Sequence, residues 1–220
     1  MRIGGVIFRS FTGFSRIISV VRIAVFVDEK NVYRDARHAF FESYDTSPHG
    51  QFHPGLLGSL LVSRTKALGA ELADVRVYTG RPDGSLDAKT YAAHMRQFAA
   101  WEKQPGISPK WRPLRYPWGG GHPEQKGVDV QLAVDMVRLY IQKAYDVAIL
   151  ASTDTDLLPA IEALYELDRG VGTSPVEVSA WSSKTIHKRL RLAGRALWCH
   201  ELSFADYQKV ADLTDYNIAP

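Results

Sequence analysis

Two carboxylates follow an apolar run in the segment Asp146–Leu158, which reads DVAILASTDTDLL. The run Val147–Leu150 is typical of a strand that is buried on both faces of a parallel sheet. Asp154 and Asp156 come soon after it, near the hydroxyl of Ser152, where the chain passes into a helix-like segment. One acid can cap that helix, but two acids beside hydroxyl residues exceed what a cap requires. The segment predicts an acidic site at the carboxyl edge of an α/β sheet, where such folds bind their ligands.

Two further segments place an acid at the end of an element. The apolar run Arg22–Val27 leads directly into Asp28, and a second helix-like segment carries Asp129 near its start. Taken singly, Asp28 is typical of a turn or cap, and Asp129 of a first-turn acid stabilised by the helix dipole. Together with Asp154 they form a set of hard oxygen ligands. We therefore expect Asp28, Asp129 and Asp154 to bind a divalent metal ion.

Asp135 lies on the same helix-like segment as Asp129, among apolar residues. Six positions separate the two acids, so they lie about 120° apart around a helix and about 9 Å apart along it. They cannot both be close ligands of one ion unless the helix lies across the site. Asp129 is the expected ligand, and Asp135 is a supporting group.

Basic residues are concentrated in segments that would flank the acidic edge. One segment follows the first expected strand, one precedes Asp129, and one follows the fifth expected strand. Such runs usually mark a solvated helix face, but here they could form a cationic rim that holds a phosphate backbone. The residues expected to contact phosphate are Lys30, Arg34, Lys126, Lys184, Lys188, Arg189 and Arg191.

Other chemistries fit the sequence less well. The glycines at residues 119–121 lack the spacing of a nucleotide-binding phosphate loop. The histidines show no spacing that argues for zinc, and Ser152 has no evident histidine partner for a hydrolase triad. Asp28 is followed by Glu29 and Lys30, whereas a phosphatase of the haloacid-dehalogenase type needs a second acid two residues after the first.

The elements that would position these residues alternate along the chain. We expect strands at residues 22–27, 74–79, 110–116, 147–150, 175–181 and 196–199. Helices are expected at residues 32–42, 56–68, 88–102, 126–144, 155–167, 186–193 and 203–212. This alternation favours a three-layer α/β/α sandwich with a mostly parallel sheet.

The totals set broad limits on the protein class. At 220 residues the chain suits one domain over residues 21–220, preceded by a poorly specified extension over residues 1–20. A net charge of only +3 gives no global signature of polyanion binding. The single cysteine, Cys199, excludes an intrachain disulfide and fits a reducing, cytoplasmic setting. No apolar run is long enough to span a membrane.

Three motifs resemble those of the NYN domain, a family of the PIN-like nuclease superfamily. They are VFVDEKN at Val25–Asn31, KGVDVQLAVDM at Lys126–Met136 and ILASTDTDLLPAI at Ile149–Ile161. Their order and spacing match the family, and the resemblance spans roughly residues 21–198. It implies a Rossmann-like fold and RNA cleavage that depends on Mg²⁺ or Mn²⁺.

The resemblance also assigns residues by position. Asn31 matches the asparagine that follows the first acid of the family, and Glu29 stands where the family usually has glycine. The carboxylate of Glu29 could join the metal shell, or it could crowd the path of the substrate. The acids that correspond to the family's site are Asp28, Asp129 and Asp154, with Asp156 and Asp135 as further acids.

Two functions from different classes remain open. The first is a metal-dependent ribonuclease in which Asp28, Asp129 and Asp154 hold Mg²⁺ or Mn²⁺ and Asp156 orients a ligand or a water molecule. The second is a non-catalytic RNA-binding or regulatory module that keeps the fold, and Glu29 favours it. RNA is the expected partner in both cases, and the sequence is compatible with a homodimer.

Overall fold

The computed structural model describes residues 20–42, 48–118, 122–170 and 174–218. The extension expected over residues 1–20 lies outside them, apart from Val20. No helix in these ranges combines the length and the apolar character needed to cross a membrane.

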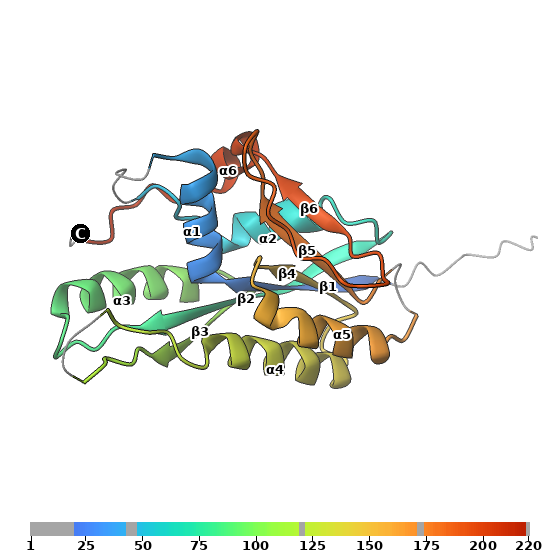
Figure 1. The fold of residues 1–220 in the computed structure, drawn as a ribbon, viewed down its shortest axis with the longest axis horizontal. Coiled ribbons are helices and arrows are strands. Elements are labelled where there is room, and N and C mark those ends of the chain that lie inside the picture. The colour runs from blue at the N-terminus through green and yellow to red at the C-terminus, as the bar shows by residue number, and fades with distance from the viewer. Residues whose placement is uncertain (1–19, 43–47, 119–121, 171–173, 219–220) are drawn as a thin grey trace, which may run out of the picture.

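A six-stranded sheet forms the centre of the molecule (Figure 1). Its strands are β1 (Val21–Asp28), β2 (Ala70–Arg81), β3 (Ile107–Pro113), β4 (Val147–Ala151), β5 (Val176–Trp181) and β6 (Cys199–Leu202). They lie in the order β3-β2-β1-β4-β5-β6, and every neighbouring pair is parallel. In such a sheet the strand order reverses direction between β1 and β4, and a crevice forms outside their carboxyl ends.

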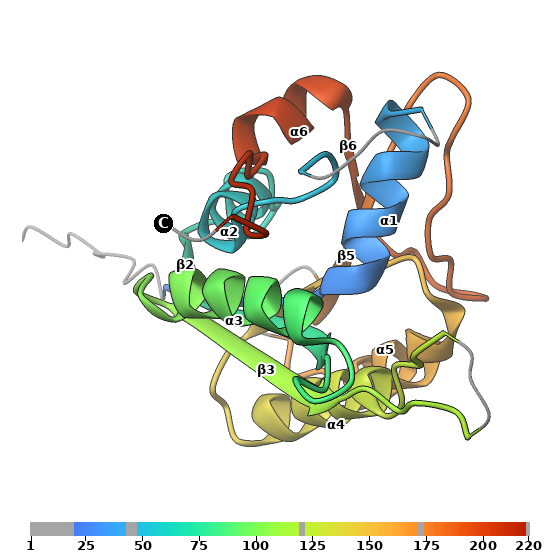
Figure 2. The same ribbon diagram turned by 90° about the vertical axis from the view of Figure 1, so that its left-hand side faces the viewer.

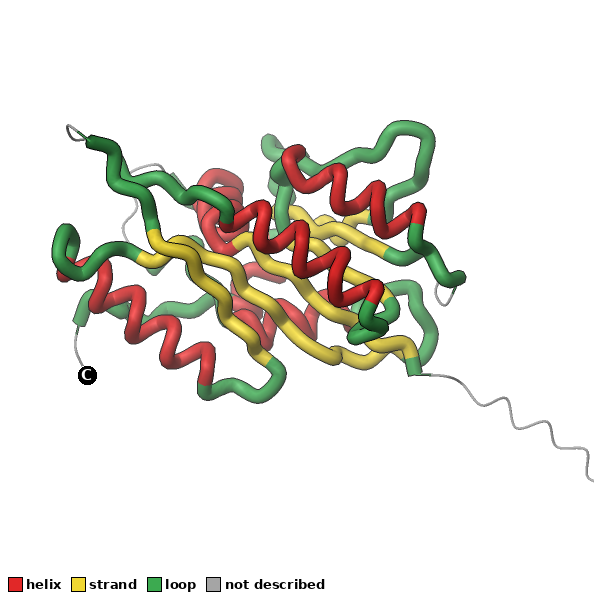
Figure 3. Tube along the Cα trace, turned by 90° about the horizontal axis from the view of Figure 1, so that it is seen from below, coloured by secondary structure: helices red, strands yellow, loops and turns green. Residues whose placement is uncertain are grey.

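Six helices in the described part of the chain flank the sheet. They are α1 (Glu29–Phe40), α2 (Pro54–Val62), α3 (Ala88–Glu102), α4 (Val128–Ile141), α5 (Leu158–Glu166) and α6 (Phe204–Val210), and a short 3₁₀ helix, η1 (Thr155–Leu157), precedes α5. Figure 1 shows α4 and α5 below the sheet and α1, α2 and α6 above it, and the view from below in Figure 3 shows helices lying across the side-by-side strands. The expected α/β/α sandwich with a parallel sheet is confirmed.

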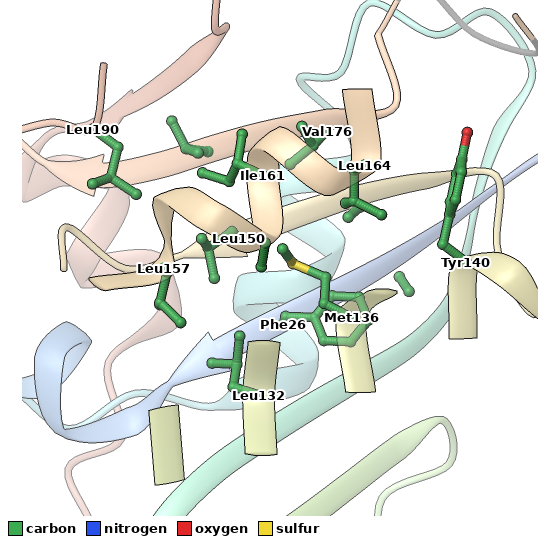
Figure 4. Packing of buried hydrophobic residues seen from close by; sticks show 14 of the residues in the cluster. Phe26, Leu132, Met136, Tyr140, Leu150, Leu157, Ile161, Leu164, Val176 and Leu190 are labelled. Carbon is green, nitrogen blue, oxygen red and sulfur yellow. The ribbon is translucent and has the colours of Figure 1, made fainter. Parts of the chain in front are cut away.

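Side chains of β1 alternate between the two faces of the sheet, as the pleat of a strand requires. Ala24 and Phe26 belong to the buried cluster between the sheet and helices α4 and α5. Ile23, Val25 and Val27 belong to the cluster between the sheet and helices α1, α2 and α6. Figure 4 shows the first cluster, in which residues of α4 and α5 pack onto the strands. Burial on both faces explains why β1 is apolar from Ile23 until it reaches Asp28.

The structure corrects one expected element. No helix forms over residues 186–193 within the described chain, which is irregular there. Leu190 is buried in the cluster under α4 and α5, while Lys188 and Arg191 are exposed. Burial of Leu190 holds the segment in this irregular course, while its basic side chains stay in solvent.

Several elements begin at other residues than expected. The first helix begins directly after Asp28, because the side chain of that residue caps it. The third strand begins three residues earlier than expected, after Gly106, and the sixth begins three residues later. The helix at residues 88–102 has the expected bounds.

Candidate functional site

Asp28 lies at the carboxyl end of β1 and is 4% exposed. Its Oδ1 accepts a hydrogen bond from the backbone N–H of Asn31 at 3.2 Å, which caps α1. Its Oδ2 accepts a hydrogen bond from the Ser152 hydroxyl at 3.2 Å. Since Val27 pairs with Ala151 in the sheet, Asp28 and Ser152 are brought together by the register of β1 and β4.

Ser152 also connects this acid to Asp154. Its hydroxyl oxygen accepts a hydrogen bond from the backbone N–H of Asp154 at 3.1 Å while donating to Asp28. Asp154 in turn caps η1, because its Oδ1 accepts from the N–H of Asp156 at 3.0 Å. Asp154 is half-buried, and Asp156 is exposed.

Asn31 and Asp35 hold the loop after β4 against α1. The Asn31 Oδ1 accepts a hydrogen bond from the backbone N–H of Thr153 at 2.9 Å. The Thr153 hydroxyl donates to the Asp35 carboxylate at 2.5 Å. This network ties α1 to the segment that carries Asp154.

Asp129 reaches the site from a third direction, in the first turn of α4. The helix is preceded by Gly127 at its N-cap, whose backbone is left-handed with a φ of 76°. A Cβ atom on Gly127 would lie 3.3 Å from the Nε of Arg112. Glycine therefore allows both the turn and the close approach of that side chain.

Most of these groups line one cavity of about 1240 Å³. Acidic residues on its wall are Asp28, Asp35, Glu124, Asp129 and Asp154, and basic or imidazole residues are Lys30, Arg34, His38, His122 and Lys188. Asn31 and Thr153 also line it. The cavity lies at the carboxyl ends of β1 and β4, where the strand order reverses.

The acids influence one another through their charges. Burial raises the pKa of Asp28 to about 7, the Asn31 hydrogen bond opposes this rise, and the charge of Asp129 adds to it. Burial also raises the pKa of Asp129, and the charges of Asp154 and Asp156 add to that shift. A cation in the cavity would relieve this repulsion.

The donor set fits Mg²⁺ or Mn²⁺ as an open site. Within the described residues, no three carboxylate, imidazole or thiol groups are gathered closely enough to hold an ion by themselves. Mg²⁺ usually takes only one or two carboxylates and keeps water or substrate phosphate as its other ligands. Oxygen donors on the wall of a wide cavity suit that mode, with Asp28, Asp129 and Asp154 as the residues that would hold the ion.

Other residues expected at the site lie elsewhere. The Glu29 carboxylate accepts a hydrogen bond from the Thr79 hydroxyl at 3.0 Å and lines a neighbouring cavity. Asp135 accepts a hydrogen bond from the Tyr78 hydroxyl at 3.1 Å and forms an ion pair with Arg138 at 2.8 Å. Neither Glu29 nor Asp135 lines the cavity of Asp28.

The expected basic residues divide into two groups. Lys30, Arg34 and Lys188 line the acidic cavity. The remaining four do not line it: Lys126 pairs with Glu124, Arg189 pairs with Glu201, and Lys184 and Arg191 are exposed.

Sequence reasoning missed Asp35 and His122. Asp35 lies four residues after Asn31, so it shares one face of α1 with it. That helical spacing was the signal that could have identified Asp35. His122 lies in an irregular loop, where no periodic signal exists.

Comparisons with known proteins cover most of the chain. The family model for the NYN domain matches residues 22–186. Among solved structures, a protein of unknown function, VPA0982 from Vibrio parahaemolyticus RIMD 2210633, is similar with 17% identity and a TM-score of 0.46, over 74% of this chain and 81% of that chain. No curated protein matches the chain. Because the family model covers well over half of the sequence, the chain belongs to the NYN domain family of the PIN-like nuclease superfamily.

Proposed function

We propose that this protein is a ribonuclease that hydrolyses phosphodiester bonds of RNA with Mg²⁺ or Mn²⁺ at the acidic cavity. The observation that carries the proposal is the meeting of Asp28, Asp129 and Asp154 in one cavity whose wall also holds Lys30, Arg34 and Lys188. Acids that can hold a cation, next to cations that can hold a phosphate backbone, suit cleavage of a polyanion. Membership of a nuclease superfamily supports the same conclusion.

Each residue has a role that follows from its position. Asp28, Asp129 and Asp154 would hold the cation, and Asp156 next to Asp154 would orient a ligand or a water molecule. When bound, the cation would neutralise phosphate charge and lower the pKa of an attacking water molecule. Ser152 connects the Asp28 carboxylate to the backbone of Asp154 through its two hydrogen bonds.

The basic side chains would position the RNA. Lys30 and Arg34 project from the first turns of α1, and Lys188 reaches the cavity from the irregular segment after β5. They come from segments far apart in the sequence and line the same cavity, so they could hold a phosphate backbone there. Lys126, Lys184, Arg189 and Arg191 would contact the RNA only outside the cavity.

A second candidate function is a non-catalytic RNA-binding module. The observation that favours it is the open arrangement of the acids, since no three potential ligand groups are gathered around one point within the described residues. In such a module the cations would still hold RNA, but the acids would not support cleavage.

Incubation of purified protein with mixed-sequence single-stranded RNA, in Mg²⁺, Mn²⁺ or EDTA, separates the two candidates. The ribonuclease gives products with either metal and none in EDTA. RNA that is bound but left intact with both metals supports the non-catalytic module. Cleavage that persists unchanged in EDTA contradicts the proposed role of the acids.

A further inference from the structure

A second cavity, of about 340 Å³, opens beside the acidic one. Lys30, Pro123 and Gln125 line both cavities, so the two share a wall. The second cavity lies over the carboxyl end of β2, where Thr79 and Gly80 contribute to its lining. It is therefore at the same edge of the sheet as the acids.

One face of α3 forms a side of this cavity. Thr90, Ala93, His94 and Gln97 line it, and their spacing of three, four and seven residues places them on one stripe of the helix. This stripe carries a hydroxyl, an imidazole and an amide but no formal charge. Such neutral polar groups are suited to hydrogen bonding with the edge of a nucleobase.

The carboxylate in the cavity is Glu29. One of its oxygens, Oε2, accepts a hydrogen bond from the Thr79 hydroxyl at 3.0 Å, which fixes the side chain. A carboxylate offers about four acceptor positions, so this bond leaves capacity for a ligand. Two neighbouring hydrogen-bond donors on a ligand could be accepted together, as a carboxylate accepts from a guanidinium fork.

His94 carries an unused hydrogen-bonding atom. Within the described residues its Nε2 is buried and has no hydrogen-bond partner. Burial, followed by the charge of Arg81, lowers the pKa of His94 to about 4, which keeps the ring neutral. The His94 ring lines the cavity and therefore keeps hydrogen-bonding capacity that a ligand could use.

Two further segments line the cavity, the loop that carries Gln125 and the C-terminal segment. Gln125 packs so closely on Gly80 that a Cβ atom on this glycine would lie 2.6 Å from the Gln125 Cγ. Tyr216 and Asn217 line the cavity from the C-terminal segment, beyond residues 22–186 that match the NYN family. In Figure 2 this segment lies between α6 and α3.

The C-terminal segment is fixed in that position. Arg96 of α3 donates a hydrogen bond from Nε to the backbone carbonyl of Tyr216 at 2.7 Å. The Tyr216 hydroxyl donates to the buried carboxylate of Asp212 at 2.8 Å. The cavity is thus partly built by a segment outside the match to the NYN family model.

We propose that this second cavity binds one nucleobase of the RNA, beside the phosphate at the acidic cavity, and that Glu29 selects guanine. The proposal rests on the proposed function for the presence of RNA. Guanine presents its N1–H and N2–H groups side by side, so one carboxylate can accept both. Uracil presents a single N–H between two carbonyl oxygens, which would face the carboxylate unfavourably.

Binding of nucleoside monophosphates in EDTA tests the cavity without any cleavage. Guanosine and uridine 5′-monophosphates carry the same phosphate, so a difference in their affinities reports the base. In calorimetric or NMR titrations we expect guanosine monophosphate to bind at least about tenfold more tightly, because hydrogen bonds to a charged group are the stronger ones. Perturbation of the His94 ring signals should accompany binding.

Variants identify the residue responsible. E29Q should remove the preference for guanine, and Q97L should weaken binding of the guanine nucleotide. E102Q changes the same charge at an exposed position at the end of α3, outside the cavity, and should behave as wild type. Equal affinity for both nucleotides, binding of neither, or a preference that survives E29Q overturns the proposal.

Cleavage of a uridine-rich RNA that contains one guanine distinguishes failure of the two proposals. Cuts at a fixed offset from the guanine, lost in E29Q, support the base site. Uniform cutting by wild type and E29Q alike refutes the base site and leaves the ribonuclease intact. Guanine-selective binding of monophosphates without any cleavage refutes the ribonuclease and leaves the base site intact.

Discussion

Ser152 connects the two strand-end acids at the level of single residues. Its hydroxyl donates to the Asp28 carboxylate and accepts from the backbone N–H of Asp154, so one buried side chain joins the two segments that carry these acids. Asp129 adds its charge from α4 without belonging to that network of bonds. The charges of these acids repel one another, so a bound cation should stabilise the fold.

Metal should therefore raise the melting temperature. At a concentration 100 times its dissociation constant, a ligand of the folded state adds about 2.7 kcal/mol, which corresponds to roughly 5–10 °C for a chain of this size. We expect this response to Mn²⁺ or Mg²⁺ in wild type and less than half of it in Asp154→Asn. Differential scanning fluorimetry measures both, and equal responses would contradict the assignment of Asp154 as a ligand.

Glu29 shows where reading the sequence residue by residue reaches its limit. It follows Asp28 directly and could be expected to share its surroundings, yet it is the first residue of α1. Successive residues of a helix point about 100° apart, and the Glu29 carboxylate is turned toward Thr79 of β2. Asp28 therefore lines the acidic cavity and Glu29 the second cavity, because α1 begins between them.

At the scale of elements, the junction between Gly127 and α4 positions Asp129. Gly127→Ala should destabilise the protein by about 1–2 kcal/mol, because a side chain is strained in the left-handed region, and should also displace Arg112 or Asp129. Gly106 is the matched control: its φ is 74° and a Cβ atom there meets nothing within 4 Å.

Gly106→Ala should accordingly show a similar loss of stability in urea unfolding but retain RNA cleavage. Cleavage at equal total protein, corrected for the folded fraction, should fall only in Gly127→Ala. Full activity in both variants would show that the start of α4 does not govern the site.

The ion pair between Arg22 and Asp146, at the amino edge of the sheet, should make the stability of the fold depend on pH. Burial opposes ionisation of Asp146, but hydrogen bonds from the Arg22 backbone and side chain outweigh it and hold the pKa of Asp146 below its ordinary value. A lowered pKa in the folded state means that stability is present above the unfolded pKa of about 3.9 and is lost as the pH falls through the folded value.

Asp146→Asn should accordingly lower the free energy of unfolding by about 1–2 kcal/mol at pH 7, since one partner is partly exposed. The difference from wild type should shrink as the pH falls below about 4. Urea titrations at pH 7 and pH 3.5 measure it. A difference that stays constant over this range would show that the ion pair has no role in it.

The elements that bear the acids were the easiest part to predict. β1 and β4 are buried on both faces, so each shows as an apolar run whose end is marked by polar residues. That the two runs are neighbours depends on strand order, which a single sequence does not encode locally. The prediction of a helix after β5 was wrong because the basic residues there have helical spacing. Burial of Leu190, and not charge, determines the course of this segment.

At the scale of the whole molecule, a nearly neutral protein must gather its cations to hold RNA. The net charge is +3, and Lys30, Arg34 and Lys188 come together around the cavity from α1 and from the segment after β5. Lys184 belongs to that same segment but does not line the cavity. Placement in the fold, and not the count of charges, should decide which lysines bind phosphate.

The salt dependence of RNA binding tests this placement. Each phosphate contact with a single strand contributes about 0.7 to the slope of log affinity against log salt. Lys188→Ala should reduce the slope by about that amount for any RNA sequence, whereas Lys184→Ala should leave it unchanged. Equal reductions in a fluorescence anisotropy series would show that the RNA path continues along the whole segment.

The most direct test of the account compares two aspartates in one RNA cleavage assay with Mn²⁺. Asp154 lines the acidic cavity, whereas Asp168 is an exposed residue after α5 that does not. Asp154→Asn should cut single-stranded RNA at least about 100-fold more slowly than wild type, because the cation supplies several kcal/mol of transition-state stabilisation. Asp168→Asn should cut as wild type does, and both variants should still bind the RNA. Cleavage by Asp154→Asn at the wild-type rate would contradict the claim that these acids hold the ion that serves hydrolysis.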